Sequence, residues 1–199
     1  MKETEAAMPS PTRPGRLQAP DPFPWAGSRN PDYVRYMCEE WGVPVHDDRR
    51  LFEMLALECF QAGLSWATIL KRRQAFRRAF SNWNLSVIAA YGSRDRARLR
   101  RDPGIIRNAR KIEAVIANAA AALKLRREFG SLDAYFWGFI GGRPITRNKG
   151  RCRRWQDLPC ESEESRRLAR DLKARGFRFV GPVACYAFMQ AVGLVDDRL

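Results

Sequence analysis

Metal ligands and paired cysteines are scarce in this sequence. Its 199 residues include one histidine, His46, and five cysteines at irregular positions, none of them in a Cys-x-x-Cys pair. A structural zinc site needs four Cys or His ligands, usually in two close pairs, and a secreted disulfide framework needs an even, regular set. We therefore expect reduced thiols, a cytoplasmic location, and neither a bound metal nor another cofactor.

Long apolar runs and strand-like patterns are also missing. No apolar stretch approaches the ~20 residues of a membrane-spanning helix, and no signal-peptide pattern opens the chain. No alternation of apolar and polar residues is long enough to predict a β-strand. These absences argue against a membrane partner and predict an all-α protein.

Negative charge is the third shortage. The sequence has 36 Lys and Arg against 22 Asp and Glu, a formal net charge of +14. Such an excess favours a polyanionic partner. Nucleic acid is the first candidate, and an anionic membrane surface is the second.

Proline divides the chain into two parts. Residues 1–24 hold six of the twelve prolines and few large apolar side chains, which predicts an extended or disordered arm. Residues 25–199 predict a single helical domain. Caps and helical periodicity predict helices over 31–41, from 47 or 48 to 63, over 65–80, 84–91 and 93–101, after 106, over 131–140, from 162 or 165 to 176, and over 183–192.

Glu58 occupies an unexpected place for a carboxylate. Leu51, Met54 and Leu55 precede it by seven, four and three residues, the spacing that places side chains on one stripe of a helix. An unpaired carboxylate buried there costs free energy or has a raised pKa. The sequence therefore predicts a partner for Glu58, which is an arginine or lysine, a tyrosine hydroxyl, or a substrate.

Aromatic residues surround this helix in the sequence. Large aromatics at helical spacing usually belong to a core. Beside a buried carboxylate they also suit a flat cationic ring, which they can sandwich by stacking while Glu58 supplies negative charge. The residues in question are Trp25, Tyr33, Tyr36, Trp41 and Trp66.

Basic residues gather at two places. The predicted helix over 65–80 has a basic side formed by Lys71, Arg72, Arg73, Arg77 and Arg78. The turn at 102–106 leads into a helix, so its backbone N–H groups can hold a DNA phosphate, although a charged run is often only a solvated face. The predicted DNA-binding residues are Gly104, Ile105, Ile106, Arg107, Arg110 and Lys111.

Several motifs resemble one known family, in order and with nearly constant spacing from about Trp25 to Asp197. They include Glu40-Trp-Gly-Val-Pro44, Leu57-Glu58, Gln61-Ala-Gly-Leu-Ser-Trp66, Gly104-Ile-Ile-Arg107, Cys185-Tyr186 and Phe188-Met-Gln-Ala191. Together they resemble the bacterial 3-methyladenine DNA glycosylase I family of the helix-hairpin-helix superfamily. The resemblance implies two helical lobes with the pocket between them.

The resemblance also implies an activity. Such enzymes flip cationic N3-alkylated purines, chiefly 3-methyladenine, out of double-stranded DNA and hydrolyse the N-glycosidic bond. By motif match Glu58 is the catalytic residue and recognises the edge of the base, Tyr36 and Trp66 stack on it, and Trp25, Tyr33, Trp41 and Ala187 complete the pocket. We expect a monomer.

The superfamily's catalytic Asp is absent from Ala119 to Glu128, as is known for this branch. N3-alkylation makes the base a good leaving group, so selective binding and electrostatic stabilisation of the transition state suffice.

Two departures from the family pattern matter. The family usually binds zinc, but Phe23 or its neighbour, Met37 and Arg198 stand at three ligand positions, and the sequence ends at Leu199 before the fourth. The expectation is therefore no metal site. A pocket-wall serine of the family is Ala187 here, which removes one hydrogen-bonding group.

Two alternative functions remain open. Ala187 and the basic loop over 143–154 would suit a glycosylase for a bulkier alkyl-purine adduct, as in a self-resistance enzyme. The chain would otherwise be a catalytically silent DNA-binding relative. Retention of Glu58, Tyr36 and Trp66 argues against silence, because a buried carboxylate without a function is readily replaced by an apolar residue.

Overall fold

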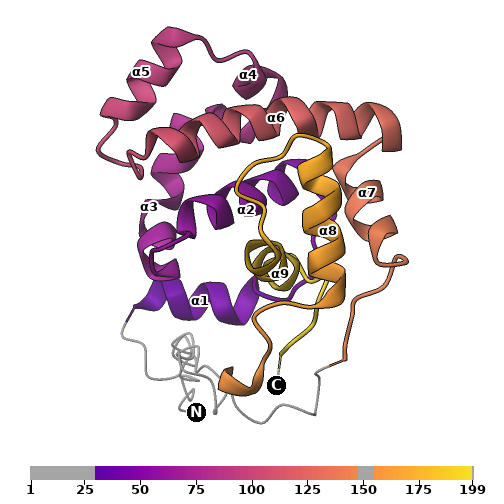
Figure 1. The fold of residues 1–199 in the computed structure, drawn as a ribbon. Helices are drawn as coiled ribbons and strands as arrows, with labels where there is room; N and C mark the ends of the chain where they lie inside the picture. The colour runs from indigo at the N-terminus through magenta and orange to yellow at the C-terminus, as the bar shows by residue number, and fades with distance from the viewer. Residues whose placement is uncertain (1–29, 148–154, 199) are drawn as a thin grey trace, which may run out of the picture.

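The structure, a computed structural model, describes residues 30–147 and 155–198, so the predicted arm over 1–24 and Trp25 lie outside the described residues. Within these two ranges the protein is all-α, as predicted, and the one β-type pairing is an isolated bridge between Ile145 and Val195. No helix in them is long and apolar enough to cross a membrane. The elements are α1 (Pro31–Glu39), α2 (Asp48–Gln61), α3 (Trp66–Ala79), η1 (Ser81–Trp83), α4 (Leu85–Ala89), α5 (Ser93–Arg101), α6 (Ala109–Phe129), α7 (Leu132–Phe139), η2 (Trp155–Asp157), α8 (Glu163–Ala174) and α9 (Pro182–Ala191) (Figure 1).

Side-chain caps begin the helices close to where the sequence predicts. The side chains of Asn30, Asp47 and Ser65 accept hydrogen bonds from backbone N–H groups in the first turns of α1, α2 and α3. The first helix ends at Glu39, two residues earlier than predicted. Gly42 follows with a φ of +74°, which turns the chain and leaves Trp41 in a loop.

Helix α2 is the centre of the fold. It contacts α3, α6, α7 and α9, and every residue from Leu51 to Phe60 is buried. A helix covered on all sides is expected to be apolar all round. Glu53 and Glu58 are the two exceptions, and their surroundings differ completely.

Glu53 lies in a cluster of guanidinium groups. Its carboxylate accepts hydrogen bonds from Arg73 Nε at 3.0 Å, Arg77 Nε at 2.8 Å and Arg50 Nη1 at 3.1 Å. Burial would raise the pKa of Glu53, but the hydrogen bond from Arg77 and the charges of Arg73 and Arg50 lower it below its ordinary value. The prediction that Arg73 and Arg77 belong to an exposed basic side of α3 is therefore wrong. Arg73 is buried, and both residues pair with the Glu53 carboxylate.

The same cluster holds α1 in place. Glu40 follows α1 directly, and its Oε2 accepts a hydrogen bond from Arg73 Nη1 at 2.8 Å and pairs with Arg50. The pKa of Glu40 is lowered because these two guanidinium groups outweigh its burial. The ion cluster of Glu40, Arg50, Glu53, Arg73 and Arg77 thus joins α1 to α2 and α3.

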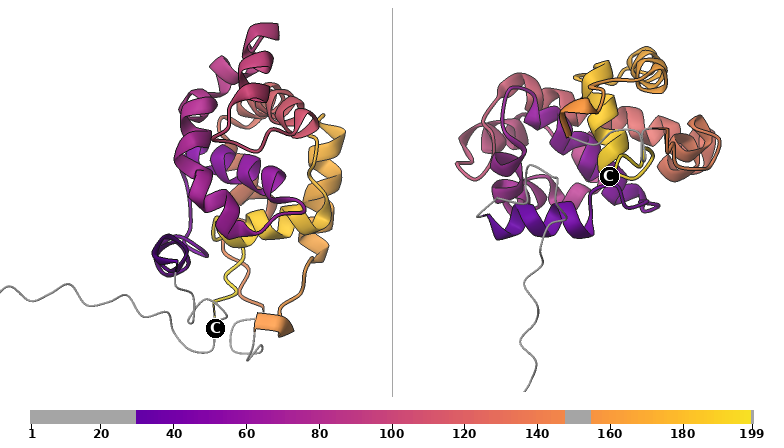
Figure 2. Two further views of the ribbon diagram at one scale, coloured as in Figure 1. Left: turned by 90° about the vertical axis from the view of Figure 1, so that its left-hand side faces the viewer. Right: turned by 90° about the horizontal axis from the view of Figure 1, so that it is seen from below.

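The loop after α1 runs along the last turn of α9. The N–H of Gly42 donates to the carbonyl of Gln190 and that of Val45 to the carbonyl of Val192, both at 3.0 Å. A Cβ at Gly193, where φ is +73°, would lie 2.5 Å from the backbone nitrogen of Pro44, so only glycine allows this approach. One end of α9 accordingly points toward α1 (Figure 2).

We expect Arg73→Ala to lower the free energy of unfolding by about 2–4 kcal/mol, because it leaves two carboxylates short of a buried partner. Arg78 is exposed on the same helix, and Arg78→Ala should stay within about 0.5 kcal/mol of wild type. Urea denaturation followed by circular dichroism measures both. Equal effects of the two variants would contradict a structural role for the ion cluster.

Candidate active site

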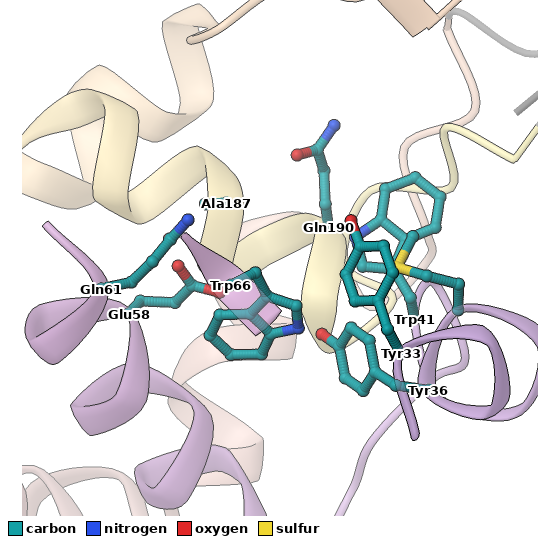
Figure 3. Close-up of a pocket in the computed structure, with 9 residues that line it drawn as sticks. Tyr33, Tyr36, Trp41, Glu58, Gln61, Trp66, Ala187 and Gln190 are labelled. Carbon is teal, nitrogen blue, oxygen red and sulfur yellow. The ribbon is translucent and has the colours of Figure 1, made fainter. Parts of the chain in front are cut away.

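A cavity of about 260 Å³ lies where α1, the end of α2, the start of α3 and α9 meet. Its volume is just below the range of about 300–1,000 Å³ typical of drug-sized ligands, so it suits a smaller molecule. Figure 3 shows Glu58 and Gln61 on one side, the α1 aromatics on the other, and Ala187 and Gln190 on α9. The lining residues are Tyr33, Tyr36, Met37, Trp41, Glu58, Gln61, Trp66, Ala187 and Gln190.

Glu58 is buried in the wall of this cavity and has no partner within the part of the chain that the structure describes. Its residue is 6% exposed, and its Oε2 has no hydrogen-bond partner among the described residues. Neither an arginine, a lysine nor a tyrosine hydroxyl of the described chain pairs with it, so two of the three partners that the sequence allowed are not found there. Burial raises the pKa of Glu58 to about 8. An unsatisfied buried acceptor that faces a cavity indicates a ligand site.

The aromatic residues form one continuous wall. The rings of Tyr36 and Trp66 have centroids 5.3 Å apart and are tilted by 50°. A flat base sandwiched between two rings needs about 7 Å, because each stacking contact takes about 3.5 Å. In this structure the rings of Tyr36 and Trp66 contact each other and leave no room for a base between them, so the stacking of both rings on a base stays a prediction.

Two polar groups of this wall are notable. Trp66 Nε1 is a buried donor without a partner in the described ranges. The pKa of Tyr36 is raised well above its usual value, first by burial and then by the nearby charge of Glu58, so its hydroxyl stays neutral. Tyr33 and Trp41 also line the cavity. Four of the predicted aromatic residues, Tyr33, Tyr36, Trp41 and Trp66, thus lie in one pocket.

Three lining residues were not predicted as pocket residues: Met37, Gln61 and Gln190. Gln61 lies three residues after Glu58 on α2, and Gln190 lies three residues after Ala187 on α9. Side chains three apart share a helix face. Helical spacing from Glu58 and Ala187 was therefore the signal that would have identified both glutamines.

No second carboxylate lines the cavity. Of the nine described lining residues, Glu58 alone carries one, and the stretch from Ala119 to Glu128 lies in the second half of α6 and contributes no lining residue. The sequence lacks the superfamily's catalytic Asp, and none of the described lining residues is an Asp.

The positions of the family's zinc ligands do not fit a metal. Met37 is buried in the cavity wall, and Arg198 pairs with Asp196 with Nε and Oδ1 2.8 Å apart. Phe23 lies outside the described residues. No group of three or more His, Cys, Asp or Glu in the described ranges is arranged to bind a metal ion.

The turn between α5 and α6 forms a compact hairpin. Asp102 Oδ1 accepts the N–H of Gly104 at 2.7 Å, and a Cβ at Gly104 would lie 2.9 Å from Ala75 Cβ. Ile105 is buried and Ile106 is half-buried, whereas Arg107 and Arg110 are exposed. No described residue accepts a hydrogen bond from the N–H of Ile106 or Arg107, which leaves these amides available to an anion.

Lys111 requires a correction. Its charge is predicted to lie on the DNA-facing side, but its ammonium group is buried and donates to the carbonyls of Phe60 at 2.9 Å and Ala62 at 2.6 Å. These carbonyls end α2, where the helix has no internal donors for them. Lys111 thus joins the start of α6 to the end of the helix that carries Glu58, and places the hairpin beside the cavity.

Comparisons with known proteins agree with this architecture. A family model described as methyladenine glycosylase matches residues 25–199. A DNA-3-methyladenine glycosylase of Haemophilus influenzae is 39% identical over 176 residues, which are 88% of this chain and 93% of that protein. DNA-3-methyladenine glycosylase 1 of Escherichia coli is 41% identical over 172 residues, 86% and 90% of the two chains.

Solved structures give the same result. The 3-methyladenine DNA glycosylase I of Staphylococcus aureus, studied for its recognition of 3-methyladenine, has a TM-score of 0.83 at 35% identity and covers 87% of this chain and 90% of its own. A variant 3-methyladenine DNA glycosylase I in complex with 3-methyladenine has a TM-score of 0.83 at 34% identity, with 87% and 91% covered. The helical fold is that of an all-α DNA glycosylase. The chain belongs to the methyladenine glycosylase family.

We expect Glu58→Gln to change how stability depends on pH. In the unfolded chain this carboxyl ionises near its ordinary pKa of 4.5, whereas the folded protein keeps the proton to about pH 8. The folded state therefore binds more protons in this window, and wild type loses stability as the pH rises from about 4.5 to 8. The glutamine variant lacks this loss and should gain roughly 5 kcal/mol relative to wild type across the window, at about 1.4 kcal/mol for each pKa unit.

Urea denaturation at several pH values tests this expectation. Glu39→Gln on exposed α1 surface is the matched control and should follow the wild-type curve. Parallel curves for wild type and Glu58→Gln would show that Glu58 is not buried as an uncompensated acid.

Proposed function

We propose that this protein is a monomeric, cytoplasmic DNA repair enzyme that hydrolyses the N-glycosidic bond of 3-methyladenine in double-stranded DNA. The observation that carries the proposal is Glu58, a carboxylate buried in an aromatic-walled cavity without a hydrogen-bond partner for its Oε2 in residues 30–147 and 155–198. Among the described residues, Glu58 Oε2 lacks both a paired positive charge and a hydrogen-bond donor. An N3-alkylated adenine in DNA supplies both.

The chemistry needs little from the protein beyond recognition. Alkylation at N3 makes the base cationic, so its bond to C1′ of the sugar is weak. When that bond breaks, its electron pair neutralises the base, and positive charge develops on the sugar until water adds at C1′. Glu58 selects the cationic base, while Tyr36 and Trp66 provide the surface on which it stacks.

Access to the base requires that the nucleotide leave the helix. The exposed Arg107 and Arg110 and the open amides of Ile106 and Arg107 would bind a phosphate of the same duplex. Because Lys111 ties this hairpin to the end of α2, phosphate binding would set the register of DNA against the cavity. Both parts belong to one chain, so one molecule is sufficient for each lesion.

One observation favours a second candidate. Ala187 lies in the cavity wall, where a small apolar side chain leaves room for a larger substituent on the base. A glycosylase for a bulkier alkyl purine would use the same Glu58 and the same aromatic wall. A silent DNA-binding relative is disfavoured, because it would retain the energetic cost of burying Glu58 without a use for it.

Release of free 3-methyladenine from methylated duplex DNA tests the activity. We expect Glu58→Gln, which keeps the shape but removes the charge, to lower kcat/KM by roughly 10- to 100-fold, the value of a charged hydrogen bond. For wild type kcat/KM should rise toward pH 8, because only ionised Glu58 offsets the charge of the base. The variant should lack this rise, and Glu39→Gln should behave as wild type.

The same assay separates the alternatives. Preferential release of a larger alkyl purine over 3-methyladenine would favour the second candidate. If wild type releases no base from any alkylated DNA yet still binds the duplex, both enzyme proposals are wrong.

The hairpin is tested by the salt dependence of binding to undamaged duplex. Arg107→Ala should weaken binding on all sequences and reduce the slope of log K against log salt by about 1, because one phosphate contact is lost. Lys111→Ala should leave the slope unchanged and instead lower thermal stability. Fluorescence anisotropy between about 50 and 200 mM salt measures the slope. An unaltered slope for Arg107→Ala would place the DNA surface elsewhere.

A further inference from the structure

Arg72 on α3 contacts the turn of the hairpin between α5 and α6. Its Nη1 donates hydrogen bonds to the carbonyl of Pro103 at 3.0 Å and to that of Gly104 at 3.3 Å. Ala75 follows three residues later on the same helix, and a Cβ at Gly104 would lie 2.9 Å from its Cβ. Residues three apart share a helix face. One face of α3 therefore holds the turn through hydrogen bonds and through close packing.

These contacts fix the orientation of the first peptide groups of the turn. The carbonyl and the N–H of one planar trans peptide point in opposite directions. The peptide that joins Pro103 to Gly104 is bound at both ends, because Arg72 donates to its carbonyl and its N–H donates to Asp102 Oδ1 at 2.7 Å. This peptide cannot rotate without losing a hydrogen bond.

Two amides of the turn remain available to an anion. The N–H groups of Ile106 and Arg107 have no acceptor in the described part of the chain, and the Ile106 carbonyl accepts the N–H of Asn108 at 2.8 Å. Amides held in one direction ahead of a helix bind a phosphate. The positive charge of Arg72 beside the same turn also offsets the carboxylate of Asp102, which by itself disfavours an anion there.

The helix that holds the turn also carries part of the cavity wall. Trp66 is the first residue of α3 and lines the cavity. Arg72 follows six residues later, about 9 Å along the helix axis. Helix α3 thus extends from the cavity to the hairpin between α5 and α6 (Figure 1). The distance between the aromatic wall and the turn is set by one continuous helix.

We propose that Arg72 is a positioning residue for DNA binding, which holds the turn so that the amides of Ile106 and Arg107 face one phosphate of the duplex at a fixed distance from the cavity. This inference rests on the proposed function and deepens it. Arg72 acts through the hairpin, whereas the side chain of Arg107 contacts the phosphate itself. The two arginines therefore differ in role, although both are basic residues at the same turn.

The test is a double-mutant cycle on the binding of undamaged duplex DNA, measured by fluorescence anisotropy. Arg72→Met keeps most of the side-chain length but removes the donors and the charge. It should weaken binding roughly five- to tenfold, because the turn is no longer held. In that background Arg107→Ala should cost less than about twofold, since its phosphate contact is already lost. If the two effects multiply instead, Arg72 acts independently of the hairpin and the inference is overturned.

Two control variants support the cycle. Arg78→Ala removes one exposed charge from α3, and Arg107→Ala should keep its full effect in that background. Arg72→Lys should bind duplex within about twofold of wild type, because an ammonium group can donate to the same two carbonyls. A loss for Arg72→Lys equal to that for Arg72→Met would contradict the inference.

Binding of free 3-methyladenine separates a displaced turn from a general loss of structure. Quenching of tryptophan fluorescence follows this binding, since Trp66 lines the cavity. Arg72→Met should keep the wild-type dissociation constant for the free base while its affinity for duplex falls. An equal loss of both affinities would indicate a merely structural role and overturn the inference.

Failure of the inference and failure of the proposed function give different results. If wild type releases 3-methyladenine from methylated DNA but Arg72→Met leaves duplex affinity unchanged, the inference is overturned while the proposed function stands. If wild type releases no base but the cycle shows the expected coupling, the proposed function falls and the role of Arg72 in duplex binding stands.

Discussion

The burial of α2 on every side is the constraint on which the rest of this structure depends. A helix in that position is expected to carry apolar residues, yet it contains two glutamates. Glu53 is matched by three guanidinium groups, so its charge is stabilised and its pKa is lowered. Glu58 has no guanidinium partner among the described residues, and burial raises its pKa to about 8. The same side chain on the same helix is thus held in an ion cluster at one position and faces a cavity five residues later.

The stability that tolerates the burial of Glu58, which has no partner in the described part of the chain, comes from its neighbours. The ion cluster, the caps and the apolar contacts around α2 offset the cost of burying one acid in the neutral form. A buried carboxyl group of this kind ionises more readily when a cation binds beside it, because the positive charge lowers its pKa. In the proposed function, this arrangement serves to recognise a positively charged base, and no strong general base is needed.

The cavity is assembled from distant parts of the chain, and the described residues hold no group of His, Cys, Asp or Glu arranged to bind a metal ion. Helix α1 is docked through Glu40 and Arg73, the loop after it is bound to the last turn of α9, and Asp197 binds Tyr186 and Gln190 from the C-terminal side. Each connection ends at a residue that lines the cavity or adjoins one that does. Ordinary hydrogen bonds and ion pairs therefore shape the site.

Local patterns in the sequence predicted much of this protein. Helix positions, most caps and the place of Glu58 on an apolar stripe follow from spacing alone, because helices are governed by neighbours three and four residues away. The gathering of Tyr33, Tyr36, Trp41 and Trp66 around Glu58 was predicted from the same short segment. What lies close in sequence and shares a helix face stays close in space.

The tertiary structure decided the partners of the charges. From the sequence, Arg73 is predicted to lie on the surface, but the fold packs it against Glu53, 20 residues before it. From the sequence, Lys111 is predicted to contact DNA. In the structure it donates a hydrogen bond to the end of α2, 51 residues away, where the helix carbonyls have no internal donor. The tilt between Tyr36 and Trp66 and the orientation of Gln190 likewise depend on how three helices meet. The charge or polarity of a residue does not by itself predict its partner. A long polar side chain pairs with whichever buried polar group the fold places within its reach without another hydrogen-bond partner.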